Sequence, residues 1–177
     1  MSVIAVRKYD DKIIIASDTQ TTWGGYKIES NNKTDAQMSN HGKLTKVNDM
    51  IIGSAGQCSH IALFEIFAKT HKPKTATRDD VLDWFFEFKE WVRVKAAVNY
   101  AELSLSFILV IENKVFSVYS WGEVVMQNDF ASVGSGMWLA IGAMEIGADP
   151  IKAVQVASKY VNTCGGGVEH LEIKTKK

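Results

Sequence analysis

The residues with the clearest chemical potential stand at the start of the chain, at Met1-Ser2. A serine directly after the initiator methionine is small enough for methionine removal, so the mature chain can begin with Ser2. Ser2 would then carry a hydroxyl nucleophile and a free α-amine, whose ordinary pKa of about 8 leaves much of it neutral and able to accept the hydroxyl proton. If Met1 stays, that nitrogen is an amide and cannot act as a base.

The other reactive residue types form no rival site. The histidines are scattered, and each is read as a surface residue or one with a satisfied hydrogen bond; they are His41, His60, His71 and His170. Cys58 lies in an apolar helical pattern and is expected in the core, whereas Cys164 stands beside a run of glycines. Because the two cysteines lie far apart and match no metal-ligand spacing, we expect reduced thiols and no metal motif.

Composition narrows the classes of function. Lys and Arg total 20 and Asp and Glu total 20, so no net charge favours nucleic acid or an anionic membrane. The sequence shows neither an apolar leader nor a run of about eighteen apolar residues. With 177 residues, 46% of them hydrophobic, we expect one domain over residues 1–177 with a sizeable core. These observations predict a cytoplasmic protein that binds neither nucleic acid nor membrane.

The elements that would position Ser2 can be read from periodicity and turn residues. Three hairpins are predicted from β-branched or alternating runs joined by polar turns; their strands cover residues 3–8 and 13–18, 43–47 and 50–54, and 103–111 and 115–121. Further strands are expected at 130–133 and 168–173. Four helices are predicted from apolar spacing and cap residues; they cover 57–69, 77–98, 137–146 and 150–161. The polar stretch 29–42 is expected to be a surface loop beside the site.

The order of these elements is strands, two helices, strands, two helices and a strand. It predicts an α+β fold in four layers, an αββα sandwich of two antiparallel sheets with a helix pair on each outer side. The helix at 57–69 is apolar nearly all round and is expected to be buried between layers. The aromatic residues of 84–91 could form a stacking platform for a ligand, but their spacing is that of a packed helix face, so we expect them in the core.

Several short motifs occur in a fixed order along the chain. They are the hydroxyl residue at position 2, Ala16-Ser17-Asp18 with Thr22 four residues later, Lys43 opening Lys-x-x-Lys, Gly53-Ser54-Ala55-Gly56 before a helix with Leu63-Phe64-Glu65, and Gly134-Ser135-Gly136 before another. In this order the chain resembles the proteasome β-subunit family of N-terminal nucleophile hydrolases, and most of all the bacterial HslV (ClpQ) peptidases. The resemblance covers essentially the whole chain and implies the N-terminal nucleophile hydrolase fold.

The resemblance implies a catalytic set of Ser2, Asp18, Lys43, Gly56 and Ser135. Ser2 would attack a peptide carbonyl, Lys43 would keep the α-amine neutral, and Asp18 would orient that lysine. The backbone N–H of Gly56 would stabilise the oxyanion, and Ser135 would hydrogen-bond near the amine. These roles describe a threonine/serine-type peptidase that cleaves unfolded polypeptides.

The resemblance also implies the ligands and partners of such a peptidase. The backbones of Thr22 and Gly56 would hold an extended peptide as an added strand. No cofactor is needed for peptide hydrolysis, and the one metal ion to consider is a monovalent cation near Cys164. The expected partners are copies of the same chain in stacked hexameric rings that form a dodecamer, an AAA+ unfoldase of HslU type, and polypeptide substrates.

The sequence departs from the family pattern at several positions. Serine replaces the usual threonine nucleophile and lacks the methyl group that restricts its rotamer. The segment between Thr22 and Lys43 is longer than is typical, which would reshape the substrate groove. Asn162 stands where an acidic residue is common, and glycines replace the usual serine after it, which would weaken support for the amine.

Two alignments of the first strand compete. Counting back from Asp18 without a gap places Ser2 in the nucleophile position, whereas matching Val6-Arg7 to the family's first strand places Met1 there. We expect Ser2. Three functions stay open: a self-compartmentalised ATP-dependent protease subunit, a catalytically inactive proteasome-like ring or shell protein, and an amidase that uses the same chemistry on small molecules.

Overall fold

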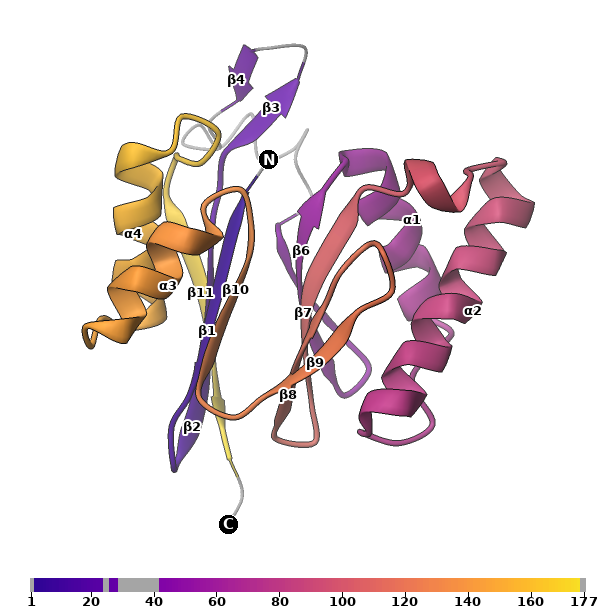
Figure 1. Ribbon diagram of the computed structural model, residues 1–177, viewed down its shortest axis with the longest axis horizontal. Coiled ribbons are helices and arrows are strands. Elements are labelled where there is room, and N and C mark those ends of the chain that lie inside the picture. The colour runs from indigo at the N-terminus through magenta and orange to yellow at the C-terminus, as the bar shows by residue number, and fades with distance from the viewer. Residues whose placement is uncertain (1, 24–25, 29–41, 176–177) are drawn as a thin grey trace.

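The computed structural model describes residues 2–23, 26–28 and 42–175, which form two facing antiparallel sheets and a smaller hairpin (Figure 1). The first sheet has the strand order β10-β1-β2-β11. Its strands are β1 (Val3–Lys8), β2 (Lys12–Asp18), β10 (Phe130–Gly134) and β11 (Val168–Lys174). Strand β1 is therefore a central strand, and it starts directly after Ser2.

The second sheet has five strands in the order β5-β6-β7-β8-β9, each antiparallel to its neighbour. Its strands are β5 (Leu44–Val47), β6 (Met50–Gly56), β7 (Leu105–Ile111), β8 (Lys114–Val118) and β9 (Val124–Gln127). The smaller hairpin consists of β3 (Thr21–Trp23) and β4 (Tyr26–Ile28), and it extends the chain beyond the end of β2.

A pair of helices covers the outer face of each sheet (Figure 1). The helices are α1 (Cys58–Ala68) and α2 (Arg78–Ala96) on the second sheet, and α3 (Met137–Glu145) and α4 (Pro150–Tyr160) on the first. A 3₁₀ turn, η2 (Tyr100–Glu102), precedes β7. The predicted four-layer αββα sandwich of two antiparallel sheets is confirmed.

The core between the two sheets follows from the alternation of side chains along each strand. On β1, Ile4 and Val6 face the second sheet, whereas Val3 and Ala5 face α3 and α4. All four are fully buried. A strand that is apolar on both faces can only sit inside a layered fold, so the first predicted hairpin fixes the position of Ser2 between layers.

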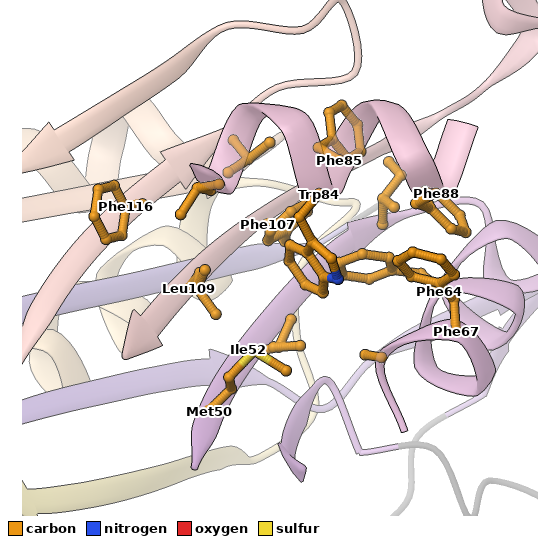
Figure 2. Packing of buried hydrophobic residues seen from close by; sticks show 14 of the residues in the cluster. Met50, Ile52, Phe64, Phe67, Trp84, Phe85, Phe88, Phe107, Leu109 and Phe116 are labelled. Carbon is orange, nitrogen blue, oxygen red and sulfur yellow. The ribbon is translucent and has the colours of Figure 1, made fainter. Parts of the chain in front are cut away.

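Aromatic side chains fill the space between the second sheet and its helices (Figure 2). The ring of Phe64 on α1 lies 5.3 Å from that of Trp84 and 4.9 Å from that of Phe88, both on α2. It also lies 4.5 Å from the ring of Phe107 on β7. The aromatic residues of α2 therefore mostly serve the core, as expected from their spacing, although Phe86 is 49% exposed.

The predicted cap residues begin the helices as expected. Thr77 accepts a hydrogen bond from the backbone N–H of Asp80 at 3.3 Å, and Asp149 accepts one from that of Lys152 at 2.7 Å. Pro150 follows Asp149 as the first residue of α4, where its missing N–H costs nothing.

Some elements differ from the expectations. Helix α2 ends at Ala96 because Ala97 adopts a left-handed conformation with φ 53°. Strands β3, β4 and β9 were not predicted from the sequence, and most of the predicted loop 29–42 lies outside the described residues.

The first helix and its cysteine also differ from the expectations. Helix α1 lies on the outside of its sheet instead of between layers, and Ile66 is 53% exposed. Cys58 is exposed and not in the core. Among the described residues, no helix is long and apolar enough to cross a membrane.

Candidate active site

Asp18 is the buried centre of the candidate site. It ends β2, is completely shielded from solvent, and accepts three hydrogen bonds. Its Oδ1 accepts from the backbone N–H of Val3 at 2.9 Å and from the ammonium of Lys43 at 2.7 Å, and its Oδ2 accepts from the N–H of Gly165 at 3.0 Å. A buried carboxylate is tolerated only when it is paired and hydrogen-bonded, and these partners meet both requirements.

Lys43 approaches Asp18 from the opposite sheet. It stands directly before β5, and its side chain is 11% exposed. The predicted pairing of Lys43 with Asp18 is therefore present in the structure as an ion pair that joins the two sheets. Because Asp18 also binds the N–H of Val3, the ammonium of Lys43 is held beside the start of β1, where Ser2 lies.

Ser2 is held through its main chain. Its carbonyl oxygen accepts hydrogen bonds from the N–H of Gly136 at 3.4 Å and from the hydroxyl of Ser135 at 3.3 Å, and the residue is 5% exposed. Gly134 pairs with Val3 across the β10–β1 ladder and has φ 95°. A Cβ at Gly134 would collide with the carbonyl oxygen of Ser2, so glycine is needed there for the close approach.

The hydroxyl of Ser135 links Ser2 to the loop after α4. Its Oγ lies 2.8 Å from Oγ1 of Thr163 and 3.6 Å from Sγ of Cys164. Thr163 was not singled out in the sequence, although it directly follows Asn162, the position flagged for its missing acid. The main chain of Asn162 helps to fix this loop, because its carbonyl oxygen accepts a hydrogen bond from Nε2 of Gln20 at 3.4 Å. The partner of Ser135 is therefore an uncharged hydroxyl.

Gly56 lies at the end of β6, with its conformation fixed by β7. It has φ 151°, and a Cβ there would collide with the carbonyl oxygen of Ser104. That carbonyl accepts from the N–H of Gln57 at 2.9 Å, and the N–H of Ser104 donates to Nδ1 of buried His60 at 3.1 Å. His60 thus has the satisfied hydrogen bond that was expected of it, and it braces the turn that presents Gly56.

Gly56 and Thr22 border the site without a direct contact to Ser2 in the described residues. Ala55, just before Gly56, has its Cβ 3.2 Å from the position of a Cβ on Gly134, which places this strand end next to the Ser2 carbonyl. Thr22 lies on β3, is exposed, and accepts from Nε2 of Gln20 at 3.4 Å. Its role in holding a peptide stays a prediction.

The glycine-rich loop after Cys164 packs against the end of β2. The carbonyl oxygen of Gly165 accepts from the N–H of Gln20 at 2.9 Å, and that of Gly167 accepts from the N–H of Thr19 at 3.1 Å. These two oxygens already serve backbone donors, and no cluster of three or more His, Cys, Asp or Glu residues exists in the described chain. The monovalent cation near Cys164 stays a prediction.

Cys164 does not rival Ser2 as a nucleophile. It is 2% exposed, and burial is the main cause that raises the pKa of its thiol, with smaller opposing contributions that include the nearby Ser135 hydroxyl. A thiol with a raised pKa stays protonated near neutral pH, and the protonated form is a poor nucleophile. The site therefore offers one candidate nucleophile, Ser2, beside one compensated ion pair.

Comparison with solved structures places this fold among known proteins. The chain is similar to BPH from Thiobacillus denitrificans in complex with epoxomicin, with 20% identity and a TM-score of 0.84 over 99% of this chain and 100% of that one. A second structure of T. denitrificans BPH gives 22% identity and a TM-score of 0.83, with 98% of each chain covered. HslV from Trypanosoma brucei gives 19% identity and a TM-score of 0.69, with 97% of this chain and 99% of that one covered.

No protein-family model and no curated protein sequence matches the chain. The likeness to these structures is therefore visible in the arrangement of the backbone and not in close sequence identity. It extends over nearly the full length of each chain, including the helices on both outer faces. The resemblance to HslV that the sequence motifs indicated is confirmed at the level of the fold: this chain has the four-layer architecture of HslV and BPH.

Proposed function

We propose that this chain is the peptidase subunit of a self-compartmentalised protease and that Ser2, exposed by removal of Met1, is its nucleophile. The observation that carries the proposal is the shared oxygen of Asp18, which binds the N–H of Val3 and the ammonium of Lys43 at once. This contact keeps a cation next to the residue whose α-amine must stay neutral. A nearby positive charge lowers the pKa of an amine, so more of it is in the basic form.

The proposed reaction follows from these positions. The α-amine of Ser2 takes the proton from its own hydroxyl while Oγ attacks the peptide carbonyl, and the N–H of Gly56 stabilises the oxyanion. Collapse of the tetrahedral intermediate breaks the C–N bond, the amine fragment leaves with a proton, and an ester forms on Ser2. Water, deprotonated by the same amine, then hydrolyses the ester and restores the hydroxyl.

The neighbours of Ser135 bear on the efficiency of this reaction. Because Thr163 is uncharged, the cluster of hydroxyls around the Ser2 carbonyl adds no negative charge that would raise the pKa of the amine. The position of Asn162 therefore does not by itself argue for an inactive shell protein. Activity depends instead on whether Met1 is removed.

The experiment that tests the proposal starts with untagged protein. Its intact mass and N-terminal sequence show whether the chain begins at Ser2, and an epoxyketone peptide then tests for a covalent adduct. We expect a chain that starts at Ser2, an adduct of one probe per chain, and hydrolysis of fluorogenic peptides. Ser2→Ala should lose both adduct and hydrolysis, and Lys43→Ala should lose hydrolysis.

Two outcomes would lead to other functions. A folded chain that keeps Met1 and forms no adduct would favour the inactive shell protein. A chain that starts at Ser2, stays monomeric and hydrolyses only small amides would favour the amidase.

We further propose that copies of this chain assemble into stacked rings, with hexameric rings as the expectation, and that an AAA+ unfoldase delivers polypeptides to them. The support is the likeness of the fold to HslV, together with three large apolar side chains that are strongly exposed on or next to the outer helix pair of the first sheet. Trp138 is 73% exposed, Ile146 is 88% exposed and Tyr160 is 68% exposed. Contact between subunits would shield these side chains from water, whereas in a single chain they stay exposed. Native mass spectrometry of the purified protein tests this and counts the subunits.

A further inference from the structure

Glu169 forms a cross-link between the two sheets next to the candidate site. It lies on β11 opposite Ser17 in the β11–β2 ladder. A single oxygen of its carboxylate, Oε1, accepts three hydrogen bonds: from the N–H of Lys43 at 2.7 Å, from the N–H of Leu44 at 3.1 Å and from the hydroxyl of Ser17 at 2.8 Å. The last strand of the first sheet thus holds the first residues of the second.

The main chain of Lys43 is held from two sides by these contacts. Its N–H donates to Glu169, and its carbonyl oxygen accepts from the N–H of Ser54 on β6 at 2.9 Å. Among the described strands, β5 lies at the edge of its sheet and pairs only with β6, so none of them supports its start from the other side. Glu169 holds the start of β5 by hydrogen bonds to the backbone of Lys43 and Leu44, next to the side chain of Lys43 that pairs with Asp18.

The fit around the carboxylate is close. A Cβ on Gly42 would lie 3.0 Å from Oε2 of Glu169, so the residue before Lys43 also packs against this side chain. Ser17, its third partner, is fully buried and precedes Asp18. The carboxylate of Glu169 therefore contacts both partners' segments of the Lys43–Asp18 ion pair. It accepts from Ser17, the residue before Asp18, and from the backbone of Lys43.

We infer that Glu169 is a positioning residue for Lys43: it fixes the lysine backbone so that the ammonium stays on Asp18 beside Ser2. This inference rests on the proposed function of Ser2. Since the attraction between charges and their effect on a nearby amine fall with distance, a displaced Lys43 would let the pKa of the Ser2 amine rise. The amine would then be protonated over a wider pH range and act less often as a base.

Two other titratable groups lie near Lys43, and substitution of Glu169 leaves both of them in the protein. Asp18 on β2 holds the ammonium, and Cys164 after α4 lies close enough to feel both charges. Burial keeps the thiol of Cys164 protonated in the neutral range. A difference in pH profile between the wild-type protein and a Glu169 variant would therefore report on the position of Lys43.

The experiment compares three variants of the full-length assembled protein: Glu169→Ala, Glu169→Gln and Glu172→Ala. Glu172 is the matched control, since it lies on the same strand and makes an exposed ion pair with Lys12 at 3.3 Å. We expect Glu169→Ala to lower kcat for a fluorogenic peptide by about 10- to 100-fold with little change in KM, the scale for a misplaced group. The acid limb of its kcat profile should move to higher pH. Glu169→Gln keeps an acceptor oxygen and should recover most of kcat.

A second readout follows the contact directly. Amide hydrogen exchange at Lys43 and Leu44 should accelerate in Glu169→Ala and not in Glu172→Ala. Unchanged exchange at both amides would overturn the cross-link. A kcat and a pH profile like those of the wild type in Glu169→Ala would overturn the positioning role, even if the variant melts at a lower temperature. A wild-type chain that starts at Ser2, assembles and hydrolyses no peptide would instead overturn the proposed function, and with it this role.

Discussion

The two helix pairs pack on their sheets with side chains of opposite size. Between α1, α2 and the second sheet the fully buried residues include large rings; these are Phe64, Phe67, Trp84, Phe85, Phe88, Phe107 and Phe116. Between α3, α4 and the first sheet the buried residues are mostly small; these include Ala5, Ala16, Ala140, Ala143, Ala153 and Ala157. Large aromatic side chains fill the space between the second sheet and its helices. On the first sheet, small side chains let the helix backbones approach the strands closely.

The part of the candidate site that holds Ser2 borders the layer of small residues. A Cβ on Gly136 would lie 2.8 Å from Cβ of Val3, 3.0 Å from Sγ of Cys164 and 3.1 Å from Cβ of Ala157. The loop that holds the carbonyl of Ser2 is therefore packed with no spare room. The comparison suggests a division of roles: the aromatic layer supplies most of the stability, and the alanine layer keeps the site geometry within narrow limits.

The largest expected effect concerns stability alone. Phe64→Ala should lower the free energy of unfolding by about 3–5 kcal/mol, because it leaves a cavity among three other rings. The activity per folded molecule should stay unchanged. Chemical denaturation measures the first quantity and peptide hydrolysis the second. The control is Ile66→Ala on the same helix, which is 53% exposed and should cost much less. A loss of activity beyond the unfolded fraction would break the division of roles.

In the alanine layer between α3, α4 and the first sheet, we expect a substitution to cost less stability but to lower activity clearly. Ala157→Val adds two methyl groups against Gly136, and overpacking of this kind costs about 1–3 kcal/mol. Because Gly136 and Ser135 hold the Ser2 carbonyl, kcat should fall more than the folded fraction does. The matched control Gln155→Val places the same side chain at an exposed position of α4. If both variants keep full kcat, the alanine layer does not set the geometry of the site.

The smallest effect tests how the aromatic layer accommodates a charge. Lys89 on α2 is 5% exposed, with its ammonium 5.1 Å from the ring centroid of Phe85 and 5.3 Å from that of Phe86. Burial lowers the pKa of Lys89. Between that lowered pKa and the ordinary 10.5, the unfolded chain binds more protons than the native one, so wild-type stability should rise with pH relative to Lys89→Met.

The measurement is the difference in unfolding free energy between the wild-type protein and Lys89→Met at neutral pH and near pH 10. A paired comparison of this kind is needed because burial also raises the pKa of Tyr119, which acts in the opposite direction above pH 10. Lys95→Met removes an exposed lysine from the same helix and is the control. A difference that stays constant over this range would contradict the assigned cost of burying Lys89.

Most of the architecture could be predicted because its signals are local. Periodicity, cap residues and turns gave the three hairpins and four helices, with errors at boundaries such as the left-handed Ala97. Strand β9 was missed because it is a short edge strand of four residues without a clean alternation. Cys58 was misplaced because a helix that is apolar nearly all round does not reveal which of its sides faces the solvent.

The site could be predicted in part because several of its residues also stand in local sequence motifs. Ser2, Asp18, Lys43 and Ser135 stand in recognisable motifs, and the structure brings these four together. Thr163 and Glu169 were missed because they act through contacts with residues 28 and 126 positions away along the chain. No period or spacing in a single sequence encodes such contacts. Only the folded arrangement of α4 and β11 reveals them.

The hydrogen bond from Gly165 to Asp18 spans 147 positions of the sequence, and it has a consequence for the order of events during synthesis. A chain made from its N-terminus exposes Ser2 early, but Asp18 lacks one of its three partners and Lys43 lacks its anchor until β11 has emerged and docked. Incomplete chains therefore carry the proposed nucleophile without the arrangement that would activate it. Under the proposed function, the capacity for cleavage therefore arises last, together with the completed fold.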